Sequence, residues 1–152
     1  MICIDTDVFI RDLLDPNDDK ALMSRKFMEE TSSIVRCTTI FNILEICGVL
    51  SAARNLDVKT TFTDFHRDKT LKIIYPDFKE YTESRSFFKN VIDNCLAYMG
   101  RQMGYKDSEI LWLCEEANCD IFITWNTRHF NEKGKVKVQT PAKYLESHEM
   151  RG

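Results

Sequence analysis

Hydrophobic and polar positions follow two alternating patterns along this chain of 152 residues. Short apolar runs rich in β-branched residues predict buried strands at 1–5, 33–38, 71–75 and 120–124, and a shorter one at 136–138. Between these runs, apolar residues recur at helical spacing. Alternation of strands with helices predicts an α/β fold of three layers, α/β/α, around a central, mainly parallel sheet of four to five strands.

The helical segments can be placed by their apolar faces and by the capping and breaking residues that flank them. They are expected at 8–14, 18–31, 40–50, around Phe62 and Phe65, at 78–104 with a break near Gly100, at 104–117 and, as a final turn, at 141–146. The core positions expected on them are Leu22, Phe27 and Met28, then Phe87, Phe88, Val91, Ile92, Cys95 and Met99, and finally Ile110, Leu111, Leu113, Cys114 and Ala117.

Size and composition narrow the class of protein. Apolar residues make up 43% of the chain and charged residues 30%, which predicts one soluble domain over 1–147, followed by a frayed tail at 148–152. No apolar run is long enough to span a bilayer, and the first residues do not form a signal peptide, so a cytoplasmic protein is expected. The net charge of −3 does not indicate a strongly basic nucleic-acid binder, but an acidic metal site would supply several of those negative charges.

The six cysteines show no C-x-x-C spacing of a zinc or redox motif. They lie at positions 3, 37, 47, 95, 114 and 119, mostly in apolar surroundings. This pattern indicates that the cysteines are free thiols, which pack as small buried hydrophobic residues in a reducing compartment.

Two acidic residues stand in apolar surroundings. Asp5 follows the first apolar run, where a buried strand must end because an unpaired carboxylate inside it would be costly. It therefore lies at the carboxyl edge of the sheet, where ligands bind in open α/β folds, although Asp5, Thr6 or Asp7 can equally cap the next helix. Glu45 lies in the nearly apolar helix 40–50 and must be paired, protonated or bound to metal; a salt bridge is the competing interpretation.

Two further polar residues belong to the same edge. Asp107 lies at the N-cap or in the first turn of the helix 104–117, where ordinary capping also accounts for it. Asn126 lies in a polar loop at the carboxyl end of the strand 120–124. In a parallel sheet, this loop and Asp5 share one edge.

Taken together, these residues resemble the PIN-domain nucleases, and the chain length is similar to that of VapC-type toxins. The order and spacing of four short segments carry the resemblance across nearly the whole chain. They are Ile4-Asp5-Thr6-Asp7, Asn42-Ile43-Leu44-Glu45, Asp107-Ser108-Glu109-Ile110, and Ile123-Thr124-Trp125-Asn126-Thr127-Arg128-His129-Phe130.

The resemblance implies a catalytic group of Asp5, Glu45, Asp107 and Asn126, in which the three acids hold the metal. Asn126 stands where the family commonly has Asp, so it adds no charge. Thr6 and Thr124 are implied as supporting hydroxyls, and Asp7 is a neighbour at a position that is often small and polar.

An all-oxygen ligand set selects Mg²⁺, for which Mn²⁺ can substitute, rather than Zn²⁺. Such an ion binds a phosphate oxygen, lowers the pKa of a bound water and stabilises the leaving oxygen. Hydrolysis of RNA phosphodiester bonds is the implied reaction, and the neutral Asn126 predicts one well-bound ion.

Basic and aromatic residues flank the same edge. Lys106 and Arg128, with His129 and Lys133, either contact RNA phosphates or only keep the surface soluble. Trp125 either stacks on a base or packs against the core.

The favoured hypothesis is a Mg²⁺-dependent endoribonuclease that acts as the toxin of a type II toxin–antitoxin pair. The resemblance implies a homodimer and a protein antitoxin whose C-terminal segment crosses the active-site groove. The alternatives are a catalytically weakened RNA-binding or scaffold protein of the same fold, and a phosphatase or other metal-dependent phosphoesterase.

Overall fold

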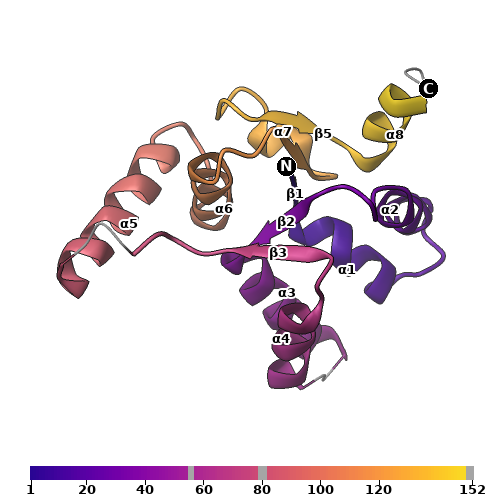
Figure 1. The fold of residues 1–152 in the computed structure, drawn as a ribbon, viewed down its shortest axis with the longest axis horizontal. Helices are drawn as coiled ribbons and strands as arrows, with labels where there is room; N and C mark the ends of the chain where they lie inside the picture. Colours follow the sequence, from indigo (N-terminus) through magenta and orange to yellow (C-terminus); the bar gives the residue numbers. More distant parts are fainter. Residues whose placement is uncertain (55–56, 79–81, 150–152) are drawn as a thin grey trace.

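A five-stranded parallel sheet forms the centre of the computed structural model, which describes residues 1–54, 57–78 and 82–149. The strand order is β3-β2-β1-β4-β5, so the first strand occupies the middle (Figure 1). The strands are β1 (Ile2–Ile4), β2 (Arg36–Thr39), β3 (Leu71–Ile74), β4 (Ile121–Ile123) and β5 (Lys137–Gln139). The predicted parallel α/β sheet is confirmed.

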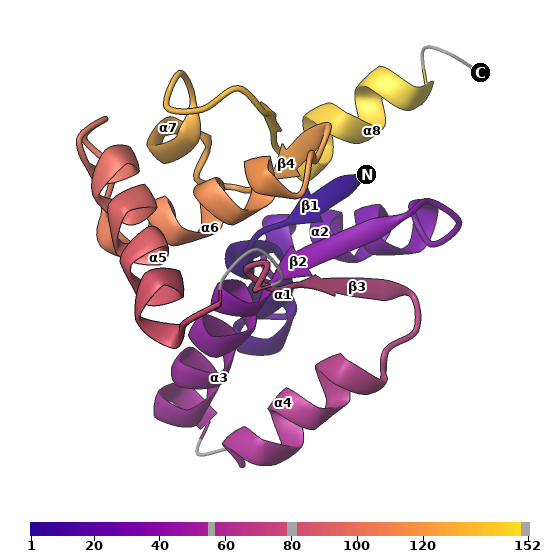
Figure 2. The ribbon, with the colours of Figure 1, turned by 60° about the vertical axis from the view of Figure 1, so that its left-hand side comes forward.

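Helices cover both faces of this sheet, as Figure 2 shows for α5 and α6 on one side. They are α1 (Thr6–Leu14), α2 (Asp19–Glu30), α3 (Ile40–Arg54), α4 (Val58–Arg67), α5 (Ser84–Met99), α6 (Tyr105–Glu116), α7 (Thr127–Phe130) and α8 (Pro141–Glu149). Among the described residues, none of these helices is long and apolar enough to cross a membrane.

Alternation along the central strands separates two hydrophobic cores. Cys3 of β1 packs in the core with residues of α5 and α6, whereas Ile2 and Ile4 pack in the core with Phe27 of α2 and Tyr144 of α8. Successive side chains of a strand point to opposite faces, so even this three-residue strand contributes to both cores. The two cores define the three-layer α/β/α architecture.

Several predicted boundaries differ from the observed ones. Strand β2 begins at Arg36 rather than residue 33, and its buried guanidinium donates hydrogen bonds to the Met28 carbonyl and to Thr70 Oγ1. Helix α1 begins already at Thr6. Helix α5 begins only at Ser84 and ends at the predicted break, with Gly100 as its C-cap. The predicted start of this helix falls partly on residues 79–81, outside the described residues.

Three predicted core positions are wrong, since Leu22, Phe88 and Ile92 are 50%, 63% and 55% exposed. Apolar residues cover more of α2 and α5 than the buried stripe, which on α5 runs through Cys95 and Tyr98. Residues one position away from such a stripe are rotated about 100° around the helix. Apolar character alone therefore predicts a wider buried face on these helices than the structure has.

Helix α8 extends through Glu149, beyond the predicted turn at 141–146 and into the predicted tail. Residues 150–152 of that tail lie outside the described residues.

Candidate active site

Asp5 lies at the carboxyl end of the central strand β1 and is 6% exposed. Its Oδ1 accepts a hydrogen bond from the backbone N–H of Thr6 at 2.8 Å, so it is also the N-cap of α1. The capping interpretation is therefore correct for Asp5. Capping does not account for the burial of a carboxylate beside other acids, which points to a second role.

Asn42 holds Asp5 from the first turn of α3. Its Nδ2 donates to Asp5 Oδ1 at 2.9 Å and to Thr6 Oγ1 at 3.1 Å. Its Oδ1 accepts from Thr39 N and Oγ1 at 3.2 and 2.7 Å, and its own N–H donates to Thr39 Oγ1 at 3.1 Å. This reciprocal pair is a variant of the capping box. Thr39 is thus the N-cap of this helix.

Sequence reasoning did not assign a role to Asn42. The T-x-x-N spacing at 39–42 signals a cap, but a cap whose amide also reaches another element cannot be read from the spacing. The structure shows that the start of α3 is joined to the end of β1 through this one side chain.

Asp7 connects α1 with the loop after β4. Its carboxylate accepts from Trp125 N at 3.0 and 3.1 Å and from Thr124 Oγ1 at 3.2 Å. Thr124 Oγ1 in turn accepts from Asn126 N at 2.9 Å. The oxygens of Asp7 are thus engaged in positioning this loop, and Thr124, which is fully buried, links Asp7 to Asn126.

Glu45 lies one turn beyond Asn42 on α3, and its side chain is 25% exposed. Its Oε1 lies 3.3 Å from Lys106 Nζ, which belongs to the first turn of α6. The salt bridge considered for Glu45 is therefore present. The helix around it is only partly enclosed, since the neighbouring Leu44 is 55% exposed.

Asp107 lies in the first turn of α6, whose N-cap is Gly104. Its Oδ2 lies 3.1 Å from His129 Nδ1, and the same nitrogen lies 2.8 Å from Asn126 Nδ2. Because Nδ1 carries at most one hydrogen, it can donate to Asp107 or accept from Asn126, but not both. His129, foreseen only as a flanking residue, thus joins Asp107 to Asn126.

Burial and mutual repulsion shape the ionisation of the two acids near β1. Burial raises the pKa of Asp5 well above its ordinary value; the charge of Asp7 and, more weakly, that of Glu45 raise it further. The nearby Thr124 hydroxyl and the hydrogen bond from Thr6 N–H act in the opposite direction and lower the pKa of Asp5. Burial also raises the pKa of Asp7, against the hydrogen bonds from Trp125 and Thr124. Negative charge is therefore costly here without a cation.

The donor set suits a hard divalent cation, since Asp5, Glu45 and Asp107 offer only carboxylate oxygens. In the described structure, oxygens of these three acids do not all lie within 4.8 Å of one another. Two of the acids are paired with Lys106 and His129. Binding of one ion by all three would require Lys106 and His129 to give way. The residues fit the ion chemically, and their convergence on it stays a prediction.

A pocket adjoins this site between α3 and α6. Glu45 and Lys106 line its polar side, and its apolar side is lined by Phe41, Leu44, Tyr105 and Ile110. An extended chain lying in this pocket would contact both the salt bridge and apolar side chains.

The flanking residues behave differently from one another. Arg128 is exposed on α7, whereas Trp125 packs against the second core and donates through Nε1 to Ser24 Oγ at 2.9 Å. The ammonium of Lys20 lies 5.5 Å from the centre of the Trp125 ring. Of the two interpretations of Trp125, the packing one is correct.

No protein-family model matches the sequence, and no curated protein matches it either. Solved structures do match. VapC20 of Mycobacterium tuberculosis, described as a toxin that cleaves the sarcin–ricin loop, matches with a TM-score of 0.60 at 9% identity, over 80% of this chain and 87% of its own.

Two toxin–antitoxin assemblies contain similar chains. A chain of VapBC2 from Rickettsia felis matches with a TM-score of 0.62 at 15% identity, over 92% of this chain and 98% of its own. A chain of VapBC-1 from nontypeable Haemophilus influenzae matches with a TM-score of 0.58 at 17% identity, over 93% and 99%. The protein therefore has the fold of the PIN-domain toxins, as predicted.

Proposed function

We propose that this protein is a Mg²⁺-dependent endoribonuclease and the toxin of a type II toxin–antitoxin pair. The observation that carries the proposal is Asp5, a buried carboxylate at the end of the central strand of a PIN-like sheet. Glu45 and Asp107 lie on the helices α3 and α6, and the Lys106–Glu45 salt bridge joins the second turn of α3 to the first turn of α6. Asn126 follows β4, the strand beside β1.

In this proposal Asp5, Glu45 and Asp107 hold the Mg²⁺ ion, and Mn²⁺ can replace it. When bound, the ion lowers the pKa of a coordinated water and stabilises the leaving oxygen of the phosphodiester. Asn126 offers a neutral carbonyl oxygen beside it. Thr6 and Thr124 are the supporting hydroxyls in this proposal; Thr6 Oγ1 accepts a hydrogen bond from Asn42 Nδ2, and Thr124 Oγ1 donates one to Asp7.

Lys106 and Arg128 are proposed to contact RNA phosphates. Lys106 now pairs with Glu45, and use of Glu45 as a metal ligand would leave the charge of Lys106 available to a phosphate. Such contacts position the RNA without reading its sequence.

The proposed partners are a second copy of this chain and a protein antitoxin. Support comes from the toxin–antitoxin assemblies in which similar chains occur. A basic side chain of the antitoxin placed near the acids would compete with the metal, as Lys106 already does for Glu45.

The test is digestion of structured RNA by the wild type, Asp5→Asn and a matched control, Asp57→Asn. Both aspartates are helix N-caps that accept backbone N–H groups, but Asp57 is exposed at the start of α4. We expect cleavage that needs Mg²⁺ or Mn²⁺, a loss of at least about 100-fold in Asp5→Asn and no loss in Asp57→Asn.

Other results would contradict the proposal in distinguishable ways. RNA binding without cleavage would favour the weakened scaffold, and turnover of a small phosphate ester instead of RNA would favour a phosphatase. If expression of the wild type arrests growth and Asp5→Asn does not, the toxin assignment is supported; cleavage without arrest contradicts it.

A further inference from the structure

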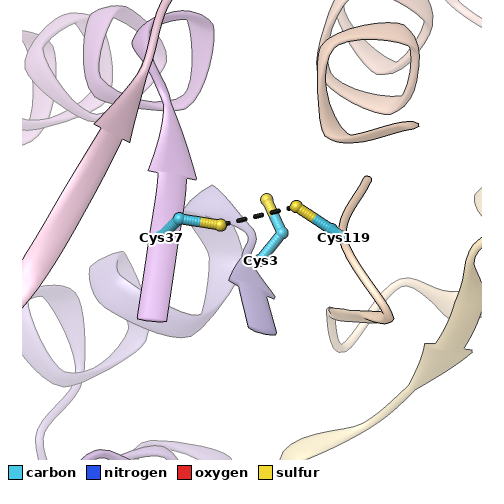
Figure 3. Close-up of side chains that lie close together, drawn as sticks. All are labelled: Cys3, Cys37 and Cys119. Atoms are coloured by element: carbon cyan, nitrogen blue, oxygen red, sulfur yellow. Dashed lines mark hydrogen bonds between the residues drawn. The ribbon is translucent and has the colours of Figure 1, made fainter. Parts of the chain in front are cut away.

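Three of the six cysteines meet between the sheet and α6, away from the acidic site, and Cys114 of α6 lies in the same hydrophobic core. Cys3 of β1 and Cys37 of β2 are register partners on neighbouring strands, so their side chains share one face of the sheet. Cys119 precedes β4. The Sγ atoms of Cys37 and Cys119 lie 3.5 Å apart, and those of Cys3, Cys37 and Cys119 all lie within 4.8 Å of one another (Figure 3).

The end of α6 brings Cys114 and Cys119 to this point. Asn118 adopts a left-handed conformation with φ of 54°, and the N–H groups of Asn118 and Cys119 donate to the carbonyls of Glu115 and Cys114. These two bonds form a Schellman motif, which turns the chain back over the end of the helix. The C-x₄-C spacing at 114–119 therefore places two thiols together, although it is not a C-x-x-C motif.

The four thiols interact with one another in a dry environment. Cys3, Cys37 and Cys114 are 0% exposed and Cys119 is 8% exposed. Hydrogen bonding to Cys114 is the main cause that raises the pKa of Cys3, and hydrogen bonding to Cys119 raises that of Cys37 to about 12. Thiols of Cys114, Cys3 and Cys37 donating to Cys119 lower its pKa. Each of these shifts has another thiol of the cluster as its main cause.

We propose that Cys3, Cys37, Cys114 and Cys119 bind one soft metal ion of the Zn²⁺ type. Tetrahedral zinc with bonds of about 2.3 Å to sulfur separates its ligand sulfurs by about 3.8 Å. The Cys37 and Cys119 sulfurs, 3.5 Å apart, lie close to this value, and the sulfurs of Cys3, Cys37 and Cys119 all lie within 4.8 Å of one another. Cys114 lies outside this group of three, so its side chain would have to move toward the ion to complete the tetrahedron. Thiolate ligands select Zn²⁺ and similar soft ions, whereas Mg²⁺ prefers oxygen.

The site has an entry path and a clear structural effect. A surface pocket lined by Tyr98, Trp112, Glu115, Val136 and Cys119 reaches the cluster from outside. A bound ion would join β1 to its two neighbouring strands, β2 and β4, and to the end of α6. Because the ligands bind as thiolates, binding releases protons.

The test uses the full chain, reduced and freed of metal, and offers Zn²⁺ alone. We expect one zinc per chain by elemental analysis, protection of the four thiols from a thiol reagent, and a higher melting temperature. Cys119→Ser should lower the bound zinc at least tenfold. Cys47→Ser, a buried cysteine outside the cluster, should retain it, and so should Asp107→Asn, which alters only the acidic site.

Zinc well below one per chain in the wild type would overturn the proposal, whatever the folding of the variants. So would equal zinc in Cys119→Ser and the wild type. A Cys37–Cys119 disulfide in the intact mass of the unreduced protein, formed in place of metal binding, would also contradict it.

Discussion

Asp5 combines two demands that are rarely placed on one side chain. It caps α1 by accepting the Thr6 N–H, and it is buried beside Asp7, so its negative charge is disfavoured. Helix capping needs only an acceptor oxygen, which Asn supplies as well as Asp. Metal binding needs the charge. The substitution Asp5→Asn keeps one acceptor oxygen and removes the charge, so it separates the two roles.

We expect Asp5→Asn to stabilise the metal-free protein, by about 1 kcal/mol, or roughly 2–4 °C in melting temperature. The variant keeps an acceptor for Thr6 N and Asn42 Nδ2 but removes a buried charge next to Asp7. Melting curves in a chelator and in Mn²⁺ measure this. Mn²⁺ should stabilise the wild type more than the variant; equal melting temperatures under both conditions would leave Asp5 as a cap only.

The same change has a pH dependence whose sign follows from the raised pKa of Asp5. In the window between the ordinary pKa of Asp, about 3.9, and the raised folded value, the folded state binds more protons than the unfolded state. Wild-type stability therefore falls as pH rises through this window. The advantage of Asp5→Asn should be absent below it and appear above it.

At the scale of elements, the site depends on how helices begin. Helices α1, α3 and α6 each begin near this edge of the sheet, and Asp5, Asn42 and Asp107 all lie at their first residues. The amide of Asn42 is the direct link between two of these helix starts. The geometry of Asp5 thus depends on the capping of α3.

We expect Asn42→Asp to destabilise the metal-free protein by about 2 kcal/mol or more, since the new carboxylate cannot donate to Asp5 and repels it. Thermal or urea unfolding measures the change, and Asn90→Asp on α5 is the control. Asn90 Oδ1 accepts from Asn94 Nδ2, a bond that an Asp side chain keeps. If both variants lose equal stability, Asn42 does not position Asp5.

At the scale of the whole molecule, the fold leaves an apolar stripe exposed on α5. Phe88, Ile92 and Leu96 follow one another along α5 at helical spacing and are 63%, 55% and 56% exposed. Contiguous apolar patches on a protein surface often mark interaction sites. The expected homodimer would bury such a stripe against a second copy.

Light scattering at micromolar concentration is expected to show a dimer for the wild type and a monomer for Ile92→Lys. Thr63→Lys, which adds the same charge to an exposed position on α4, should remain dimeric. A wild type that is strictly monomeric would remove the homodimer, and a dimeric Ile92→Lys would place the interface elsewhere.

The order of elements, the parallel sheet and the position of Asp5 were determined by the sequence alone. Hydrophobic periodicity is a local property that differs between strands and helices. The alternation of strands with helices could therefore be predicted along the chain. The end of β1 could also be predicted, because burial of an unpaired charge inside a strand is costly.

Only the tertiary structure decided which side chains meet. Glu45 with Lys106, Asp107 with His129, and Asn42 with Asp5 each join elements separated by many residues. The local pattern of apolar and polar residues does not show which side chains from distant segments come into contact. The same reason applies to Cys3, Cys37 and Cys119, whose burial was foreseen but whose gathering depends on the register of β1 with β2 and on the turn after α6.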